Sequence, residues 1–207
     1  MGKRWMRDKK RDYYYRKAKD EEYRSRASYK LKQLNKKFRI IKKGYNVVEL
    51  GSAPGGWTQV AREIVGEEGK IVAVDISRMQ SLRYENVTEI QGDFTREETI
   101  EEIKRIVPIA DAVISDASPD ISGVWDIDHF KSIELCENVI GISDKLLRHG
   151  GNLLFKVFQG EGIEDLRAEV KKRFRYVKSS KPKASRSGSA EIYIIARGFM
   201  GRPDERQ

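Results

Sequence analysis

The sequence predicts an α/β domain built on an open, mostly parallel sheet with helices on both faces. Short apolar runs rich in β-branched residues recur along the chain, segments with helical apolar spacing separate them, and one run ends in a glycine-rich turn. The chain has 207 residues, enough for one domain with a full core but too few for two large ones. We therefore expect one main domain over residues 25–200, preceded by a different segment, 1–24, and followed by a tail, 201–207.

Residues 1–24 are basic and rich in tyrosine, and they show no apolar periodicity. Lysine and arginine side chains can pair with phosphates while tyrosine rings stack on bases. We interpret this segment as a partly disordered arm that binds RNA. The alternative is a charged tail with no specific role.

A helix is expected over residues 26–38, where leucine and phenylalanine recur at helical spacing. Lys30 lies one residue before this apolar stripe, so its aliphatic stem can lie against the core while its amine reaches a cleft. A lysine in such a place is usually an ordinary surface residue. Lys30 becomes a candidate site residue only through the segments that follow.

The glycine-rich turn comes next. Residues 45–50 form an apolar run typical of a buried strand, the turn spans 51–56, and a helix is expected over 57–65. A strand that ends in glycines lets the backbone approach a ligand closely and directs the following helix N-terminus at it. A dinucleotide-binding turn would show G-x-G-x-x-G, whereas Pro54 lies in the centre of this turn and Glu49 precedes it.

The acid-L-G-x-x-P-G-G pattern resembles the first motif of S-adenosylmethionine (SAM) methyltransferases. The carboxylate and ammonium of SAM can be held by N–H and C=O groups of such a loop, and acidic side chains suit its sulfonium cation and ribose diol. The residues that the resemblance assigns to SAM binding in this turn are Gly51, Ser52, Gly55, Gly56 and Trp57. The alternative is a turn that only packs a Rossmann-like sheet.

Two further strands end in an acidic residue. Residues 70–75 form the second strand, and Asp75 at its end can accept hydrogen bonds from a ribose diol. Residues 87–94 contain a third short strand, after which Asp93 can accept from the adenine amine with Phe94 beside the ring. The alternative role for Asp93 is to cap the helix that follows.

The fourth strand ends in the sequence D-A-S-P, which begins at Asp116. Carboxyl ends of parallel strands share one edge of an open sheet, so Asp116 should face the glycine-rich turn. Amino-group methyltransferases that act on bases typically carry N/D-P-P-Y here, and this chain has no aromatic residue there to stack a flipped base. A 5-methylcytosine enzyme needs a cysteine nucleophile in a loop, and Cys136 lies in an expected helix. Base methylation is therefore disfavoured.

A loop and a long helix follow the fourth strand. Trp125 lies in the loop 120–126 and is a candidate lid over the substrate. The helix is expected over 128–148, with apolar residues, Phe130 among them, directed at the core.

Lys156 lies inside the fifth apolar strand, L-L-F-K-V-F. A lysine in a buried strand is costly unless its ammonium reaches a polar cleft or a partner, so we assign Lys156 a functional role. A helix (164–174), a strand (176–178) and a basic loop rich in glycine and serine (181–189) follow. The final strand begins at Glu191 and is expected as an edge strand or an inserted antiparallel one.

Charge is segregated along the chain. Residues 1–43 carry 18 basic against 5 acidic side chains and 171–186 carry 8 against none, whereas 44–170 carry 12 basic and 24 acidic ones. Basic ends suit a polyanionic partner and an acidic middle suits a cationic cofactor. The alternative is the high charge content common in thermophile proteins.

Composition also excludes several classes of protein. No apolar run is long enough to span a bilayer and no secretory signal is visible, so we expect a soluble, cytoplasmic protein without a membrane partner. One cysteine and two histidines are too few for a disulfide or a zinc site, and we expect no metal. We also expect a monomer.

Five motifs in order, S-R-A-S-Y-K-L, G-S-A-P-G-G-W, S-D-A-S-P, L-L-F-K-V-F-Q-G and S-R-S-G-S-A-E-I-Y, closely resemble the FtsJ/RrmJ (RlmE) family of RNA ribose 2′-O-methyltransferases. The resemblance runs from about Arg24 to Ala196 and implies a Rossmann-like methyltransferase fold, with a seven-stranded, mostly parallel sheet and an antiparallel last strand. For bacterial-type members it implies a uridine of large-subunit ribosomal RNA as target, while related members modify the tRNA anticodon loop or an mRNA cap. The chain departs in its longer tyrosine-rich arm and in D-A-S-P, where relatives often have a bulkier second residue.

The resemblance implies four catalytic residues, Lys30, Asp116, Lys156 and Glu191. A ribose 2′-hydroxyl is a poor nucleophile, and it must be aligned behind the SAM methyl with its proton removed or polarised. A lysine amine can take that proton only if its pKa is lowered, by desolvation or by a nearby cation such as Lys30. Asp116 would orient Lys156 and lie near the methyl donor, and Glu191 would orient the second lysine or the ribose. Alternatively, Lys156 only steers the hydroxyl lone pair.

The sequence thus predicts SAM-dependent ribose 2′-O-methylation of RNA, with ribosomal RNA as the expected substrate. One alternative is a ribose of the tRNA anticodon loop. Another is a non-catalytic RNA-binding protein that keeps a relic SAM pocket. A nicotinamide dehydrogenase is the weakest alternative, because Pro54 lies in the turn and no second dinucleotide-binding half is evident.

Overall fold

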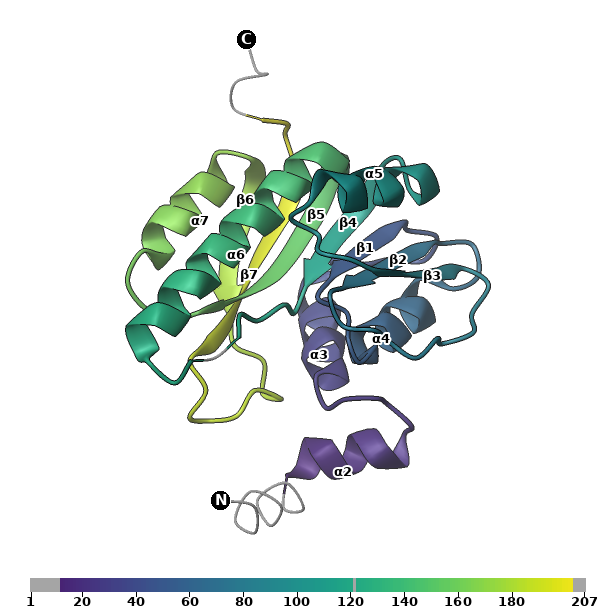
Figure 1. Ribbon diagram of the computed structural model, residues 1–207, viewed down its shortest axis with the longest axis horizontal. Helices are drawn as coiled ribbons and strands as arrows, with labels where there is room; N and C mark the ends of the chain where they lie inside the picture. The colour runs from purple at the N-terminus through teal and green to yellow at the C-terminus, as the bar shows by residue number, and fades with distance from the viewer. Residues whose placement is uncertain (1–11, 121, 203–207) are drawn as a thin grey trace.

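The computed structural model describes residues 12–120 and 122–202, which form a seven-stranded sheet covered by helices (Figure 1). The strands are β1 (Val47–Leu50), β2 (Ile71–Asp75), β3 (Val87–Gln91), β4 (Ala110–Ser115), β5 (Leu147–Phe158), β6 (Phe174–Ser180) and β7 (Glu191–Phe199). The helices are α2 (Tyr13–Asp20), α3 (Ser28–Phe38), α4 (Gly56–Val65), α5 (Glu97–Ile106), α6 (Trp125–Leu146) and α7 (Ile163–Lys171).

The sheet has the strand order β3-β2-β1-β4-β5-β7-β6. The pairs among β3, β2, β1, β4 and β5 are parallel, whereas β7 is antiparallel to both β5 and β6. The predicted mostly parallel sheet with an antiparallel last strand is therefore confirmed, and β7 is inserted between β5 and β6 rather than added at the edge. The strand order reverses between β1 and β4, which is where open α/β sheets bind their ligands.

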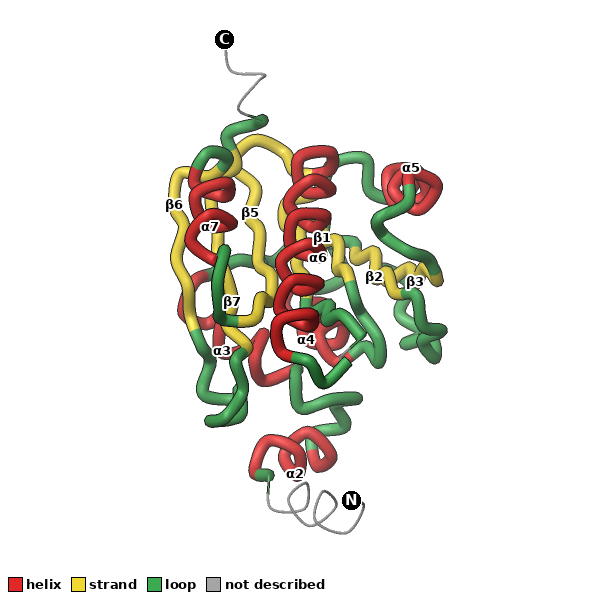
Figure 2. Tube along the Cα trace, turned by 60° about the vertical axis from the view of Figure 1, so that its left-hand side comes forward, coloured by secondary structure: helices red, strands yellow, loops and turns green. Residues whose placement is uncertain are grey.

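Helices cover both faces of the sheet, with α5, α6 and α7 on one face and α3 and α4 on the other (Figures 1 and 2). Alternate residues of β1 point to opposite faces, as the pleat of a strand requires. Val48 and Leu50 belong to the core under α5, α6 and α7, and Val47 belongs to the core under α3 and α4. Because both faces are covered, the strands are apolar nearly throughout, which explains the continuous apolar runs in the sequence.

Residues 13–20 of the arm, which was predicted to be partly disordered, form the helix α2. Asp12 begins α2 by accepting a hydrogen bond from the Tyr15 backbone N–H at 3.2 Å. Ala18 on this helix is buried against Tyr29 and Ala184, in a small apolar cluster separate from the two cores of the sheet. The helix lies below the sheet in Figure 1, beyond α3. Residues 1–11 of the arm and 203–207 of the tail lie outside the described residues.

Helix α6 differs from its prediction in where it begins. It starts at Trp125, so the residue expected in a loop as a lid lies in the first turn of a helix, with its ring stacked on those of His129 and Phe158. Phe130, expected to face the core, is 71% exposed. The prediction for Phe130 was wrong, because the buried stripe of α6 passes through His129 and Ser132 instead.

Candidate active site

Two cavities open at the edge of the sheet where the parallel strands end. The smaller cavity has a volume of about 500 Å³, and the exits of β1, β2, β3 and β4 contribute to its walls. Its lining includes the predicted site residues Gly51, Asp75, Asp93, Phe94 and Asp116. The larger cavity has a volume of about 830 Å³ and lies between α2, the start of α3 and the loop that joins β6 to β7. Lys30 and Glu191 line the larger cavity.

The glycine-rich turn forms one wall of the smaller cavity. Gly51 has φ of +75°, and a Cβ atom added to it would lie 2.6 Å from the Cα of Ala117, just past the end of β4. Only glycine permits both this backbone conformation and such a close approach of the two strand exits. Asp75 fixes the turn to the end of β2, because its carboxylate accepts hydrogen bonds from the backbone N–H groups of Ala53 and Ser77, at 2.8 and 2.7 Å.

Not every predicted SAM contact lines the smaller cavity. Ser52 faces a neighbouring hollow that it shares with Asp75, and Gly55, Gly56 and Trp57 line neither of the two main cavities. The Trp57 indole N–H donates to the Ala27 carbonyl at 2.8 Å, and its ring lies 5.8 Å from that of Tyr193. The structure therefore gives the Trp57 side chain a packing role, between α4, the start of α3 and β7.

Gly56 also acts through packing. A Cβ atom on Gly56 would lie 2.3 Å from Ser25 Oγ and 2.8 Å from Ser28 Oγ, so the start of α4 lies directly against the segment that leads into α3. The Ser28 hydroxyl donates a hydrogen bond to the Gly56 carbonyl at 3.0 Å. Cofactor contacts by Ser52, Gly55, Gly56 and Trp57 stay predictions.

The chemistry of the smaller cavity fits a cationic cofactor with a ribose diol. Asp75, Asp93 and Asp116 all line it, which supplies carboxylates for a positive charge and acceptors for hydroxyl groups. Hydrogen bonds from the side chain and backbone of Thr95 hold the pKa of Asp93 below its usual value. Glu49, at the end of β1, is buried, and burial raises its pKa to about 8. Its Oε2 atom has no hydrogen-bond partner within the described chain.

Lys156 and Asp116 meet at the carboxyl ends of β5 and β4. The Lys156 side chain is almost fully buried, and its Nζ donates to the Asp116 carbonyl at 2.8 Å and lies 3.4 Å from Asp116 Oδ1. The same Oδ1 accepts a hydrogen bond from the Tyr193 hydroxyl at 2.7 Å. The lysine thus has the polar partner that its place in a buried strand requires.

Lys30 and Glu191 form a second ion pair, in the wall of the larger cavity. Lys30 Nζ lies 2.7 Å from Glu191 Oε2, and the Lys30 residue is 8% exposed because α3 packs on the sheet through Leu31 and Leu34. Burial acts to raise the pKa of Glu191, but the Lys30 ammonium, with Lys156 further away, holds it below its usual value. Glu191 is therefore a carboxylate that pairs with Lys30 and interacts through its charge with Lys156.

The four predicted catalytic residues therefore lie together between the two cavities. Asp116 lines the smaller one and Lys30 and Glu191 line the larger one. Tyr193, which the sequence analysis missed, joins the two ion pairs: its hydroxyl contacts Asp116, and Lys30 Nζ lies 5.7 Å from its ring centre. Burial, and next the Asp116 charge, raise the pKa of Tyr193, so it remains a hydrogen-bond donor.

A period-two pattern could have identified Tyr193. It follows Glu191 by two residues in E-I-Y, so both side chains point to the same face of β7. The antiparallel register then sets Tyr193 directly opposite Lys156. That register depends on long-range strand pairing, which the local pattern does not contain.

The described residues form neither a metal-binding group nor a membrane-spanning helix. Among residues 12–120 and 122–202, no group of three or more histidine, cysteine, aspartate and glutamate side chains is arranged to hold a metal ion. Within the same ranges, no helix combines the length and the apolar content that a membrane crossing requires.

Comparison with known proteins shows the family of the chain. The family described as FtsJ-like methyltransferase matches residues 23–199. The chain is 52% identical over 203 residues to a protein of Methanothermobacter thermautotrophicus named ribosomal RNA large subunit methyltransferase E, covering 98% of this chain and 96% of the relative. It is 49% identical over 207 residues to a protein of the same name from Methanobrevibacter smithii, covering 100% and 99%.

A solved structure from Plasmodium falciparum, described as that of a ribosomal RNA methyltransferase, is also similar. The TM-score is 0.77 and the sequence identity 30%, with 87% of this chain and all of that chain covered. Family match, full-length relatives and solved structure agree with the motifs and with the fold. The chain belongs to the FtsJ-like methyltransferase family.

Proposed function

We propose that this protein transfers a methyl group from SAM to a ribose 2′-hydroxyl of large-subunit ribosomal RNA, and that the target nucleotide is a uridine. Membership of a methyltransferase family supports methyl transfer. Relatives about half identical over nearly their full length are named ribosomal RNA large subunit methyltransferase E, which supports the RNA substrate. The ribose position is supported by the chemistry of the site.

The observation that carries this proposal is the pair of ammonium–carboxylate contacts between the two cavities, Lys156 with Asp116 and Lys30 with Glu191. Methylation of an alcohol needs a group that polarises the hydroxyl and directs its lone pair, rather than an aromatic slot for a base. Nearly buried lysines held by carboxylates meet that need. The D-A-S-P segment after β4 provides no aromatic ring to stack an extruded base.

SAM, when bound, supplies an electrophilic methyl group on a sulfonium centre. Asp75, at the end of β2, would accept hydrogen bonds from its ribose diol, Asp93 and Phe94 would contact the adenine, and Asp116 would lie near the positive charge. Gly51 keeps the backbone of the turn close to the end of β4, and both segments line the smaller cavity.

The two lysines have different roles in this proposal. Lys156, as an ammonium, would donate a hydrogen bond to the 2′-hydroxyl oxygen and direct its other lone pair at the methyl carbon, and the hydroxyl proton would leave to solvent as the new C–O bond forms. Lys30 would bind the phosphate or ribose of the target nucleotide from the side of the larger cavity. Asp116 and Glu191 would hold these amines in place, and Tyr193 would fix the orientation of the Asp116 carboxylate.

Labelled methyl transfer followed by ribose mapping tests the function. Purified protein is incubated with SAM carrying a tritiated methyl group and total RNA from cells that lack this protein. Because a 2′-O-methyl group blocks alkaline cleavage of the adjacent phosphodiester, the product is mapped by partial alkaline hydrolysis. We expect one protected uridine in large-subunit rRNA. Label on a base, or no RNA label, would contradict the proposal, and a protected tRNA ribose would move the target to the anticodon loop.

A further inference from the structure

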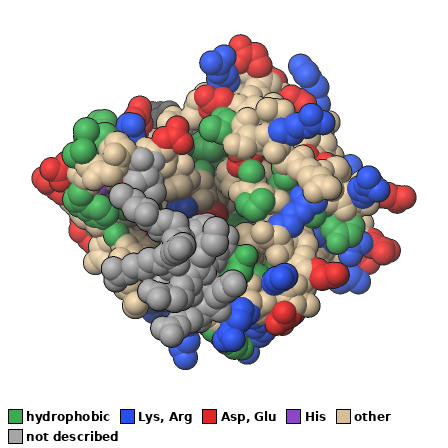
Figure 3. All heavy atoms as spheres, turned by 60° about the horizontal axis from the view of Figure 1, so that its bottom comes forward, with side chains coloured by type: hydrophobic (Ala, Val, Ile, Leu, Met, Phe, Trp, Pro, Cys, Tyr) green, Lys and Arg blue, Asp and Glu red, His purple; other side chains and the backbone are tan. Residues whose placement is uncertain are grey.

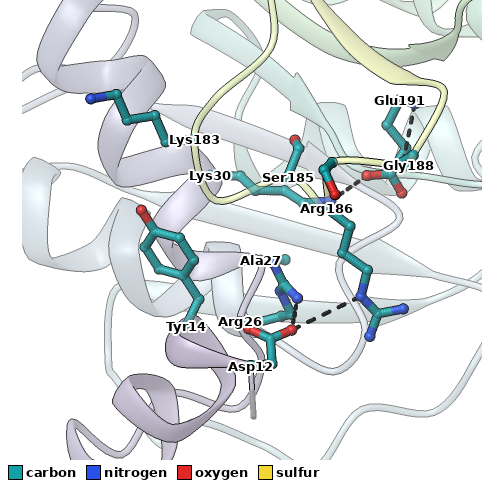
Figure 4. Close-up of a pocket in the computed structure, with 12 residues that line it drawn as sticks. Asp12, Tyr14, Arg26, Ala27, Lys30, Lys183, Ser185, Arg186, Gly188 and Glu191 are labelled. Atoms are coloured by element: carbon teal, nitrogen blue, oxygen red, sulfur yellow. Dashed lines mark hydrogen bonds and ion pairs between the residues drawn. The ribbon is translucent and has the colours of Figure 1, made fainter. Parts of the chain in front are cut away.

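A cluster of one acidic and two basic residues lies in the larger cavity, outside the four catalytic candidates. Asp12 precedes α2, Arg26 precedes α3, and Arg186 lies in the loop between β6 and β7. Figure 4 shows the two guanidinium groups converging on the Asp12 carboxylate from separate segments. Asp12 Oδ2 is ion-paired with Arg26 and lies 3.9 Å from Arg186 Nε.

The two arginines are held close together despite their like charges. Burial, followed by the charge of Arg186, lowers the pKa of the Arg26 guanidinium. A hydrogen bond from Arg26 Nη2 to the Ala184 carbonyl fixes its orientation. Two neighbouring guanidinium groups present several N–H donors and need a shared anion, and this arrangement suits the oxygens of a phosphate group.

The position of the arginines relates this anion site to the RNA chain. Arg26 and Arg186 line the same cavity as Lys30 and Glu191. A strand of RNA that brings a ribose to Lys30 therefore carries its backbone phosphates along this wall. The face that comes forward in Figure 3 carries lysine and arginine side chains interspersed with aspartate and glutamate side chains.

We propose that Arg26 and Arg186 form a binding site for a backbone phosphate of the RNA substrate, and that Asp12 occupies this site while RNA is absent. The inference rests on the proposed function in taking RNA as the substrate. On binding, the phosphate replaces the Asp12 carboxylate between the two arginines. The start of α2 then moves away from the cavity wall.

The packing of α2 makes this exchange feasible. Helix α2 contributes the buried Ala18 and the partly buried Tyr14 to a cluster that is separate from both cores of the sheet, so a shift of its start leaves those two cores untouched. The exchange also has a cost, because the ion pairs of Asp12 must break before the phosphate binds. Every RNA that uses the two arginines bears this cost, so Asp12 weakens RNA binding at this site whatever the RNA sequence.

The substitution Asp12→Asn tests the exchange. Asparagine keeps a side-chain oxygen for the Tyr15 N–H and is an equally good N-cap, so α2 is preserved while the competing charge is removed. Affinity is measured by fluorescence anisotropy, with S-adenosylhomocysteine present, for a transcript of a large-subunit rRNA fragment and for an oligouridylate. We expect Asp12→Asn to bind both RNAs about tenfold more tightly than the wild type, a change of about 1.4 kcal/mol.

Asp20→Asn is the matched control, because it removes the same charge from the other end of the same helix, where the side chain is exposed. A merely electrostatic effect of net charge would appear equally in both variants. If Asp12→Asn binds RNA no more tightly than Asp20→Asn does, Asp12 is a permanent structural partner of the arginines and the inference is overturned.

A second pair of variants tests the arginines themselves. Arg186→Gln should weaken binding of both RNAs about tenfold and lower the slope of log affinity against log salt by about one, because one phosphate contact is lost. Arg175 lies at the start of β6, in a different hollow. Arg175→Gln should therefore change the slope no more than the loss of one positive charge from the net charge does. In the Arg186→Gln background, Asp12→Asn should give a clearly smaller gain. An undiminished gain would contradict a shared site.

Binding and turnover are read separately, so the two proposals can fail separately. Methyl transfer by the wild type with no effect specific to Asp12→Asn would overturn only the phosphate site. Tighter RNA binding by Asp12→Asn, with no methyl transfer to any RNA by the wild type, would leave the phosphate site standing and remove the proposed function. Thermal melting of each variant confirms that the fold is retained.

Discussion

At the scale of single residues, Lys156 carries the strongest prediction. Replacing it by alanine removes the amine nearest to Asp116 without touching the lining of the smaller cavity. We expect Lys156→Ala to lower the methyl-transfer rate by at least about a hundredfold, the usual contribution of a positioned acid or base, while SAM affinity changes by less than about threefold. Single-turnover transfer and calorimetric SAM binding measure the two quantities.

The control for Lys156→Ala is Lys131→Ala, which removes an exposed lysine from α6. It should leave both the transfer rate and SAM affinity near the wild-type values. Equal turnover by wild type and Lys156→Ala would remove Lys156 from the mechanism.

Tyr193→Phe tests whether the tyrosine hydroxyl positions Asp116. The substitution keeps the buried ring and removes only the hydrogen bond to Asp116 Oδ1. A hydrogen bond to a charged group contributes about 1.5 to 3 kcal/mol, so kcat should fall about 10- to 100-fold while KM for RNA changes little. A fall in melting temperature with unchanged kcat would instead assign Tyr193 a purely structural role.

Glu49 gives a prediction for the pH dependence of stability. Burial raises its pKa to about 8 in the folded protein, against an ordinary value of 4.5 that the unfolded chain retains. Between these values the folded state binds more protons than the unfolded state, so the contribution of Glu49 to stability is complete below about pH 4.5 and is lost as pH rises towards 8.

Glu49→Gln removes this dependence, because glutamine stays neutral. We expect the variant to gain stability relative to the wild type as pH rises from 5 to 8, by up to about 4 kcal/mol, in denaturant unfolding without SAM. The exposed Glu134→Gln on α6 is the control and should show no such trend. A constant difference across pH would mean that Glu49 is ionised in the folded protein.

At the scale of elements, the close approach of the β1 and β4 exits can be tested with two glycines. Gly51→Ala places a Cβ atom 2.6 Å from the Ala117 backbone at a φ of +75°, so we expect a loss of about 2 to 4 kcal/mol in the free energy of unfolding, and weaker SAM binding. Gly141→Ala lies within α6, where an added Cβ meets nothing within 4 Å. It should stabilise the protein by about 0.5 to 1 kcal/mol.

Elements with a strong local signal were predicted correctly, and those without one were not. The parallel strands could be recognised in the sequence as apolar runs because both faces of the sheet are covered. Helix α2 gives no such signal, because only Ala18 is buried and its tyrosines reach partners far along the chain. For α6, Phe130 was expected inside because its side chain is apolar, but it lies one position after the buried His129, on the exposed side of the helix.

The same distinction holds for the active site. Lys30, Asp116, Lys156 and Glu191 could be proposed from the sequence because each lies in a motif of its own. The contacts among them could not be read there, since Tyr193 reaches Asp116 only through the pairing of β7 with β5. The arrangement of Asp12 between two arginines likewise depends on three segments that meet only in the folded chain.

At the scale of the whole molecule, charge and topology agree. The antiparallel strand β7 brings the basic loop before it to the edge where the parallel strands end, next to the beginnings of α2 and α3. Four aspartates of the middle segment, Asp75, Asp93, Asp116 and Asp120, line the smaller cavity at the exits of β2, β3 and β4. One edge of the sheet therefore presents an aspartate-lined cavity beside a cavity with more basic than acidic side chains, which suits the cationic cofactor and the polyanionic substrate of the proposed function.

The separation of the two cavities has a kinetic consequence. Each opens to solvent, and the lysine and carboxylate pairs lie between them, so neither ligand has to pass through the space of the other. The two substrates can therefore load in either order, and by-products can depart without waiting for one another. S-adenosylhomocysteine should inhibit competitively against SAM and non-competitively against RNA, and an RNA with a 2′-deoxy target nucleotide should inhibit competitively against RNA and non-competitively against SAM; an uncompetitive pattern in either cross-comparison would show a compulsory order. A compulsory binding order would mean that one cavity opens to its substrate only after the other substrate has bound.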